Sequence, residues 1–242
     1  MTPPAGLRAV LFDLDDTLYP EHQFVDGGFR AVARFVAARS GQSDASLVAR
    51  LWELHARDGR GRLFDTLLAE VGLGGDPDIV LACLLLYRSH EVRLEPFPGV
   101  ERALDEISDA GMLIGVLSDG QASVQRRKLA GLPGVARRLD VVVLTAELGP
   151  AYAKPSPVGY RVACRILDVP PSATVYVGND PAKDFAGARA AGLYTVRLGR
   201  PPRTGGPLDR PPGAADDADV TLDGLELLPA LLAGRGPGIL PR

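Results

Sequence analysis

The sequence predicts an α/β protein that has a three-layer core around a parallel sheet and a helical subdomain inserted into that core. Short apolar runs rich in Val, Ile and Leu alternate with longer stretches that have helical spacing. This alternation is typical of βαβ units, and nearly continuous apolar strands are typical of a sheet covered on both faces. The gap between the first two apolar runs, residues 13–112, is far too long for one crossover helix. This gap predicts the insertion.

The core elements are expected at defined positions. Strands are predicted at residues 9–12, 113–117, 141–144, 175–177, 195–198 and 219–222. Helices are predicted at residues 100–110, 124–132, 158–167 and 184–191. Residues 200–218 are dense in Pro and Gly and are expected to form an exposed loop. Because doubly wound sheets bind ligands at the carboxyl ends of their strands, the residues that follow each strand are the first candidates for a site.

The insertion itself has a helical pattern. Residues 20–95 carry apolar residues at helical spacing, interrupted by glycine-rich turns, and about four helices fit this pattern. We therefore expect a discontinuous core domain, residues 1–19 and 96–242, and a helical subdomain, residues 20–95.

Composition narrows the class of partner. With 46% hydrophobic and 24% charged residues, the chain has the make-up of a folded globular protein and not of a disordered one. Its 27 basic and 30 acidic residues give a formal net charge of -3, so no large positive field attracts nucleic acid or anionic membranes. A small molecule is the expected partner.

Cysteine usage and the apolar runs predict the compartment. Cys83 and Cys164 stand alone, with no CxxC pattern and no histidine at ligand spacing, which favours a reducing environment. The first residues lack the pattern of a signal peptide, and no apolar run reaches the roughly 18 residues of a membrane span. These features predict a cytoplasmic protein.

Carboxylates follow the first predicted strand. Asp13 and Asp15 alternate with Leu14, which places both carboxylates on the same side of the chain where it leaves the sheet, and Thr17 follows. Taken alone, this pattern fits a turn or a helix cap as well as an active site, because Asp and Thr favour both.

Polar residues also follow the other predicted strands. The second strand ends in Ser118-Asp119-Gly120, and the fourth is followed by an acidic segment, residues 178–184. Lys154 follows the third strand, and only three of the 27 basic residues are lysines, so this one does not come from a lysine-rich background. A compact ammonium group is a suitable point charge for a phosphate.

Together these segments resemble the four motifs of the haloacid dehalogenase (HAD) superfamily, in the order in which that family has them. Phe12-Asp13-Leu14-Asp15-Asp16-Thr17-Leu18-Tyr19-Pro20 is similar to the first motif in its phosphatase form, Ser118 to the second, Lys154 to the third and residues 178–184 to the fourth. The insertion lies where the helical-cap branch of the family carries its cap, so residues 20–95 are expected to be that cap.

A finer likeness concerns one branch of this family. The Thr17-Leu18-Tyr19 segment and the spacing of Gln125, Lys128 and Leu129 are similar to pyrimidine 5'-nucleotidase-like phosphatases. The resemblance implies a Rossmannoid HAD-like core and a hydrolase that acts on a small phosphate monoester, of the nucleotide or sugar phosphate class.

The resemblance also implies a Mg²⁺ cofactor. Its expected ligands are Asp13, the main-chain carbonyl of Asp15 and an acidic residue of the fourth motif. This motif departs from the usual Gly-Asp and reads Gly178-Asn179-Asp180. A dication is better held by two carboxylates than by one, so Asp180 is the preferred ligand and Asn179 the alternative. Asp184 is expected to orient Lys154 or the metal-bound waters.

The resemblance assigns chemical roles to the remaining residues. Asp13 is the nucleophile that forms an aspartyl-phosphate, and Asp15 is the general acid and base. Ser118 and Lys154 hold the phosphoryl oxygens, and Thr17 shapes the loop. Asp119 and Gly120 complete the same substrate-binding segment. Asp119 stands where that branch commonly has Asn, so it brings an additional negative charge.

Three alternatives remain open at this stage. A 2-haloacid dehalogenase uses the same aspartate on carbon, but it has no need of a carboxylate at the position of Asp15. A phosphomutase shares every motif. A non-catalytic binding protein would be expected to lack Asp13, Asp15 or Lys154, and all three are present. The oligomeric state is not readable from the sequence.

Overall fold

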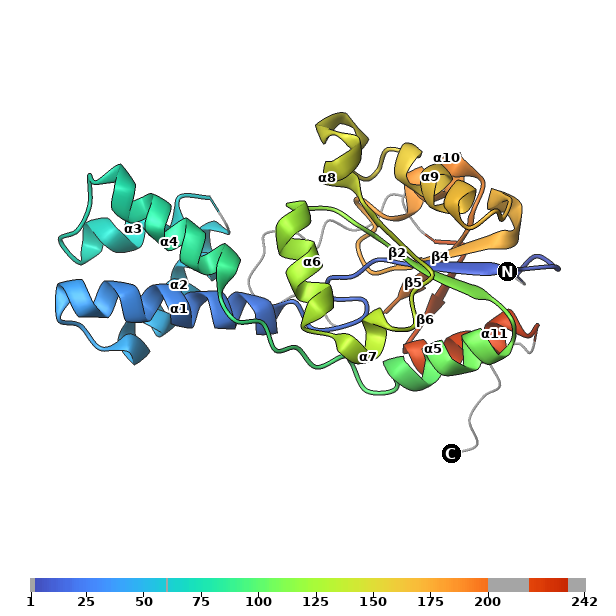
Figure 1. Ribbon diagram of the computed structural model, residues 1–242, viewed down its shortest axis with the longest axis horizontal. Helices are drawn as coiled ribbons and strands as arrows, with labels where there is room; N and C mark the ends of the chain where they lie inside the picture. The colour runs from blue at the N-terminus through green and yellow to red at the C-terminus, as the bar shows by residue number, and fades with distance from the viewer. Residues whose placement is uncertain (1–2, 60, 200–217, 235–242) are drawn as a thin grey trace. The chain divides into compact units, whose positions relative to one another are not determined.

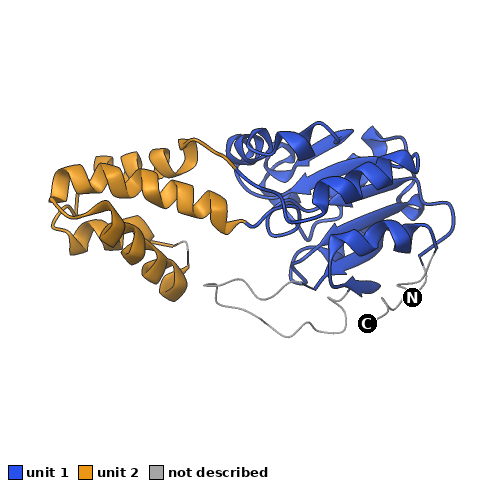
Figure 2. Ribbon diagram, turned by 90° about the horizontal axis from the view of Figure 1, so that it is seen from below, with its two compact units in different colours: residues 1–20, 94–200, 211–242 blue, residues 21–93, 201–210 orange. Residues whose placement is uncertain are grey.

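The computed structural model describes residues 3–59, 61–199 and 218–234. These residues form two compact units, shown in Figure 2. One unit holds the described residues up to Pro20 and from Leu94 onward, and the other holds those between Glu21 and Arg93. The expected loop at residues 200–218 lies outside the described residues except for its last residue.

The first unit is built on a six-stranded sheet in which all neighbouring strands are parallel. Its strands, in the spatial order β3-β2-β1-β4-β5-β6, are β3 (Val141–Leu144), β2 (Leu113–Ser118), β1 (Ala9–Phe12), β4 (Thr174–Gly178), β5 (Tyr194–Leu198) and β6 (Val220–Leu222). Strand β1 lies between β2 and β4, and Phe12 pairs with Val116 on one side and Val177 on the other. Chain segments that leave these three strands therefore start next to one another, at the switch point where such sheets bind ligands.

Helices cover both faces of this sheet, as Figure 1 shows, with α9 and α10 on one side and α5 and α11 on the other. The described helices of this unit are α5 (Val100–Asp109), α6 (Ala122–Ala130), α7 (Pro133–Ala136), α8 (Thr145–Leu148), α9 (Val158–Ile166), α10 (Phe185–Ala191) and α11 (Leu228–Leu232). Three single turns complete the unit, at η1 (Pro150–Tyr152), η2 (Pro171–Ala173) and η3 (Leu225–Leu227). The predicted three-layer α/β fold with a parallel sheet is confirmed.

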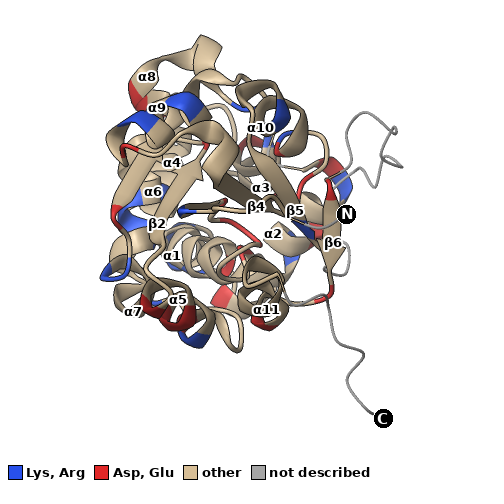
Figure 3. Cartoon of the chain, turned by 90° about the vertical axis from the view of Figure 1, so that its right-hand side faces the viewer, with Lys and Arg blue, Asp and Glu red and all other residues tan. Residues whose placement is uncertain are grey.

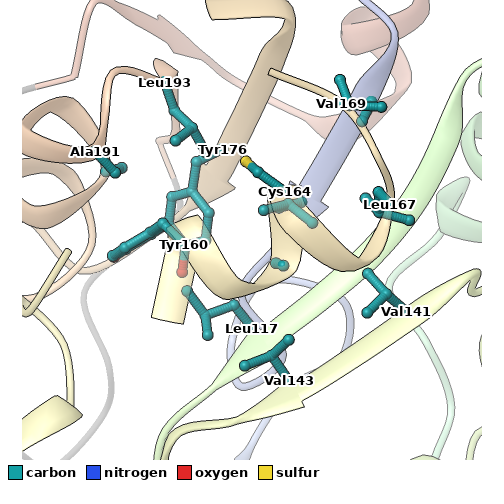
Figure 4. Packing of buried hydrophobic residues seen from close by; sticks show 14 residues of the cluster. Leu117, Val141, Val143, Tyr160, Cys164, Leu167, Val169, Tyr176, Ala191 and Leu193 are labelled. Carbon is teal, nitrogen blue, oxygen red and sulfur yellow. The ribbon is translucent and has the colours of Figure 1, made fainter. Parts of the chain in front are cut away.

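Large side chains pack between α9 and the sheet. Figure 4 shows Tyr160 of α9 against Tyr176 of β4, with Leu117 of β2 nearby. The two tyrosine rings meet edge to face, 4.8 Å between centroids. All three side chains are fully buried, and each contributes about 1.5–3 kcal/mol through removal of apolar surface from water. This packing fixes the strand ends that carry the candidate site residues.

Charges of both signs are scattered over the outer helices of this unit (Figure 3). Many lie in exposed ion pairs, such as Arg126 with Glu147 and Arg102 with Glu106. Such pairs contribute little to stability, because water screens them.

The second unit consists of four helices, α1 (His22–Ser40), α2 (Asp44–Asp58), α3 (Leu63–Glu70) and α4 (Pro77–Ser89). Helix α2 is capped by Ser43, whose hydroxyl accepts from the Ser46 amide, and α4 is capped by Asp76, whose carboxylate accepts from the Asp78 amide. The helices share an apolar core of their own around Phe29. None of the helices in the described residues has the length and apolarity needed to cross a membrane.

Candidate active site

The first motif forms a tight turn at the end of β1. The Asp13 amide donates to the Val177 carbonyl at 2.9 Å, which continues the pairing with β4 by one residue. Asp16 adopts a left-handed backbone conformation, φ 56°, and its amide donates to the Tyr19 carbonyl at 3.0 Å. Aspartate tolerates this conformation better than most residues because its short side chain bonds locally. The turn leaves Asp13 buried and Asp15 partly exposed.

Lys154 lies at the centre of a buried ionic cluster. Its Nζ is 2.5 Å from Asp13 Oδ1, 2.7 Å from Asp184 Oδ1 and 3.1 Å from the Tyr176 hydroxyl. Burial alone lowers the pKa of Lys154, but the two carboxylates outweigh it and hold the pKa well above its usual value. Burial raises the pKa of Asp13 to about 7, although the charge of Lys154 acts in the opposite direction. Lys154 is therefore positively charged and supports the ionised form of Asp13.

Asp184 connects this cluster to the loop after β4. Its Oδ2 accepts from the amides of Asn179 at 3.1 Å and Asp180 at 2.9 Å, while its Oδ1 accepts from the Tyr176 hydroxyl. The Tyr160 hydroxyl in turn donates to the Asp184 carbonyl at 2.7 Å. Asp184 thus determines the path of the loop as well as the position of Lys154.

The two candidate metal ligands of this loop point to different partners. Asn179 Oδ1 lies 3.2 Å from the Thr17 hydroxyl, which is also 3.4 Å from Asp13 Oδ2. Asp180 Oδ1 accepts instead from the Ala182 amide at 3.0 Å, and its Oδ2 lies 3.7 Å from the Lys183 ammonium. Asn179, and not Asp180, therefore shares a hydrogen-bond partner with Asp13, the Thr17 hydroxyl.

A second ionic cluster surrounds Asp15. Lys128 Nζ lies 2.8 Å from both carboxylate oxygens, Gln125 Nε2 donates to Oδ2 at 2.9 Å, and the Tyr19 hydroxyl donates to Oδ1 at 2.5 Å. Gln125 Nε2 is also 2.7 Å from the hydroxyl of Ser118. Both donors from α6 are buried. Two neighbouring carboxylates of the first motif thus have two different lysine partners.

The end of β2 supplies a buried hydroxyl and an anchored carboxylate. Asp119 Oδ1 accepts from the Thr145 hydroxyl at 2.7 Å and from the Lys154 amide at 3.1 Å. Its charge is therefore used to hold the segment that carries Lys154. Gly120 has φ 103°, a conformation that side chains other than hydrogen rarely adopt. The chain turns here into α6.

The candidate residues lie in one connected network within the α/β unit. Hydrogen bonds link Asp13, Thr17, Lys154, Asn179 and Asp184, and Gln125 links Asp15 to Ser118. Asp119 joins the two sets, because it bonds both Gln125 and the Lys154 amide. Sequence reasoning assigned no site role to Gln125, Lys128 or Tyr176. The scarcity of lysine was a usable signal for Lys128, whereas Tyr176 lies inside an apolar strand and gave no signal.

The oxygen donors near Asp13 suit a hard cation. Among the described residues, no group of three or more His, Cys, Asp and Glu side chains has the arrangement of a metal site. A carboxylate of Asp13 and the amide oxygen of Asn179 nevertheless converge on Thr17. Mg²⁺ prefers oxygen ligands and keeps several waters, so a few protein oxygens are sufficient. The donor set fits this ion.

Comparison with known proteins identifies the class. The family model for haloacid dehalogenase-like hydrolases matches residues 7–192. Two curated relatives illustrate this match. The chain is 34% identical over 200 residues to the glyceraldehyde 3-phosphate phosphatase of Methanopyrus kandleri, over 80% of this chain and 84% of that protein. It is 29% identical over 227 residues to the phosphoserine phosphatase of Thermus thermophilus, over 80% of this chain and 89% of that protein.

A solved structure agrees with this match. The 2-haloacid dehalogenase of Pseudomonas syringae superposes with a TM-score of 0.60 and 27% identity, over 94% of this chain and 98% of that one. The protein is a hydrolase with a parallel α/β core. It belongs to the haloacid dehalogenase-like hydrolase family, and its two curated relatives above are phosphatases.

Proposed function

We propose that the protein is a Mg²⁺-dependent phosphatase that hydrolyses a small phosphate monoester through an aspartyl-phosphate on Asp13. One observation carries the proposal. Asp13 and Asp15 leave the same strand end, and each is paired with its own buried lysine. One carboxylate is thus placed as a nucleophile, and a second, more accessible one is placed to carry a proton.

In the first step, a carboxylate oxygen of Asp13 attacks phosphorus and the bond from phosphorus to the ester oxygen breaks. The protonated carboxyl group of Asp15 gives its proton to that departing oxygen, so the alcohol leaves neutral. Asp13 then carries the phosphoryl group and Asp15 is a carboxylate.

In the second step, the carboxylate of Asp15 takes a proton from water while the water oxygen bonds to phosphorus. The bond between phosphorus and the Asp13 oxygen breaks, which releases inorganic phosphate and restores the Asp13 carboxylate. Asp15 is again protonated, so the cycle closes without another reactant.

Positive charge and hydrogen-bond donors lower the barrier of both steps. A phosphate dianion repels an attacking carboxylate, and the ammonium of Lys154 offsets this repulsion where charge develops. The hydroxyl of Ser118 is positioned at the same strand edge as a donor to phosphoryl oxygens. Asp119 serves this site indirectly, since it holds the main chain of Lys154.

We place Mg²⁺ at Asp13, the main-chain carbonyl of Asp15 and Asn179. When bound, the ion would neutralise charge on the phosphate group. Charge considered alone favoured Asp180, but the carboxylate of Asp180 bonds its own loop, and the Asn179 side-chain oxygen shares the Thr17 hydroxyl with Asp13. We therefore prefer Asn179, the alternative in the sequence interpretation.

The proposed substrate is a small phosphorylated metabolite. Curated relatives are named for glyceraldehyde 3-phosphate, phosphoserine and phosphoglycolate, which are all phosphate monoesters of molecules with two or three carbons. This favours a compact sugar phosphate or organic acid phosphate over a nucleotide. The helical unit is proposed to act as the cap that selects among such esters.

Dehalogenation is the second candidate, because the Pseudomonas syringae enzyme shares 27% of its residues with this chain. Halide leaves without a proton, so dehalogenation assigns no task to the second carboxylate, Asp15, which Gln125 and Lys128 hold at the strand end. Phosphatase chemistry explains Asp15 and dehalogenation does not. A phosphomutase would use the same groups but return the phosphoryl group to its substrate.

The test is a screen of the purified protein with Mg²⁺. The compounds are glyceraldehyde 3-phosphate, phosphoserine, phosphoglycolate, two nucleoside monophosphates and 2-chloropropionate. We expect phosphate release from at least one of the three small esters and loss of that activity on chelation of the metal. Release of chloride without any phosphatase activity would overturn the proposal, as would activity that persists without divalent cation.

A further inference from the structure

Two buried side chains of α6 contact Asp15. Gln125 and Lys128 are three residues apart, so they lie on one face of the helix. Lys128 Nζ is 2.8 Å from each oxygen of Asp15, and Gln125 Nε2 is 2.9 Å from Oδ2. The steps described above assign no task to either residue, although burial of a lysine is costly without a compensating partner.

Gln125 also connects Asp15 to the phosphate-binding edge of the sheet. Its Nε2 lies 2.7 Å from the Ser118 hydroxyl and 2.7 Å from the Asp119 carbonyl, both at the end of β2. A movement of Gln125 would therefore displace the proton carrier and the phosphoryl-binding segment together. Gln125 thus fixes the position of Asp15 relative to Ser118.

We infer that Lys128 and Gln125 are positioning residues that hold the Asp15 side chain in the orientation needed for proton transfer. Proton transfer requires the carboxyl group within about 2.6–3.2 Å of the oxygen that it protonates. Asp15 lies on a turn beyond the sheet and its side chain is 21% exposed, so packing alone does not fix its orientation. The three contacts from α6, together with the Tyr19 hydroxyl, do. This inference rests on the proposed function, since it assigns the proton transfer to Asp15.

The dependence of rate on the leaving group provides a specific test. An alkyl ester expels a strongly basic oxygen that needs a proton, whereas p-nitrophenyl phosphate expels a stable phenolate. The quantity to compare is kcat/KM, which covers the steps up to loss of the alcohol and excludes phosphoenzyme hydrolysis. In Lys128→Met, kcat/KM should fall about 100-fold for the fastest of the three small esters of the screen and less than about 10-fold for p-nitrophenyl phosphate.

Control variants separate this role from a general loss of structure. Arg126→Met removes the same charge from the same helix, but Arg126 is exposed and pairs with Glu147, so both kcat/KM values should stay near wild type. Asp15→Asn should show the same leaving-group pattern as Lys128→Met, with a larger loss. If Lys128→Met does not fold by circular dichroism, Gln125→Met is the second variant and should change the ratio in the same direction.

The outcomes are distinct. A selective loss for the small ester supports the positioning role. An equal loss for both esters, or no loss, in a folded variant of an active enzyme would overturn it while leaving the proposed function in place. A wild-type protein that hydrolyses neither kind of ester would overturn the proposed function, and the role of Lys128 with it.

Discussion

Two aspartate–lysine pairs lie at the end of β1. Their aspartates, Asp13 and Asp15, are only two residues apart along the chain, but the surroundings of the two pairs differ. In the pair of Asp13 and Lys154, the side chains are 10% and 4% exposed. In the pair of Asp15 and Lys128, they are 21% and 5% exposed. The first pair also contains the buried carboxylate of Asp184, whereas the second is completed by neutral donors.

The difference follows from the elements that build each pair. The Asp13 pair joins the loops after β1, β3 and β4 and rests on the buried rings between α9 and the sheet. The Asp15 pair joins one turn to one helix. A nucleophile gains from a fixed position, while a group that gives a proton to one molecule and takes it from another must remain accessible. The contrast between the pairs therefore matches the two tasks that we propose.

The largest expected effect is at the nucleophile. Asp13→Asn preserves size and hydrogen bonding but removes the attacking carboxylate, so kcat should fall at least about 1,000-fold. Phosphate release and circular dichroism are measured on the same sample. Wild-type activity in a folded Asp13→Asn protein would exclude the covalent mechanism and remove the distinction between the two pairs.

Loss of the lysine in the buried pair should be the next largest effect. Lys154→Ala removes charge that both substrate and transition state need, so we expect KM to rise and kcat to fall, with a combined loss of at least about 100-fold in kcat/KM. Steady-state kinetics with saturating Mg²⁺ measure both constants. A change in KM alone would make Lys154 a substrate-binding residue only.

The metal ligand next to the buried pair gives a more moderate effect. Asn179→Ala should raise the Mg²⁺ concentration needed for half-maximal initial rate by about 10-fold, because the side-chain oxygen near Asp13 is lost. Asp180→Ala should have a smaller effect, since it removes contacts within the loop. The opposite ranking would return the ligand assignment to Asp180.

The smallest effect is expected on stability, and it is tested at one tyrosine next to each pair, Tyr176 beside Lys154 and Tyr19 beside Asp15. Tyr176→Phe removes a donor to the buried Asp184 carboxylate and should lower the free energy of unfolding by about 1.5–3 kcal/mol. Tyr19→Phe removes one donor to the partly exposed Asp15, which keeps its donors Gln125 and Lys128, and should cost about 1 kcal/mol or less. Urea denaturation followed by circular dichroism compares the two variants. Equal losses would contradict the difference in exposure between the pairs.

Much of the fold was predictable because strand burial has a simple signature. Each of the apolar runs became a strand of the parallel sheet, with ends shifted by at most one residue. The candidate residues that follow strands came together because parallel strands end at the same edge. Sequence reasoning could place Asp13, Asp15, Ser118 and Lys154 near one another for this reason alone.

The remaining features depend on three-dimensional geometry. The contact of Lys128 with Asp15 spans 113 residues and depends on how α6 leaves β2, which spacing along the chain does not reveal. The choice between Asn179 and Asp180 depends on a local hydrogen bond, because Asp180 caps the turn at Ala182. Charge alone does not reveal this local contact.

The most direct test of the two proposed tasks is an acid quench of the Asp15→Asn variant during turnover of a radiolabelled phosphate ester. If Asp13 is the nucleophile and Asp15 activates water, the variant should retain a phosphoryl group on the peptide that contains Asp13, and hydroxylamine should release it. The label should be absent when Asp13→Asn is added. Phosphate release without any labelled peptide, or a label on another residue, would contradict the account.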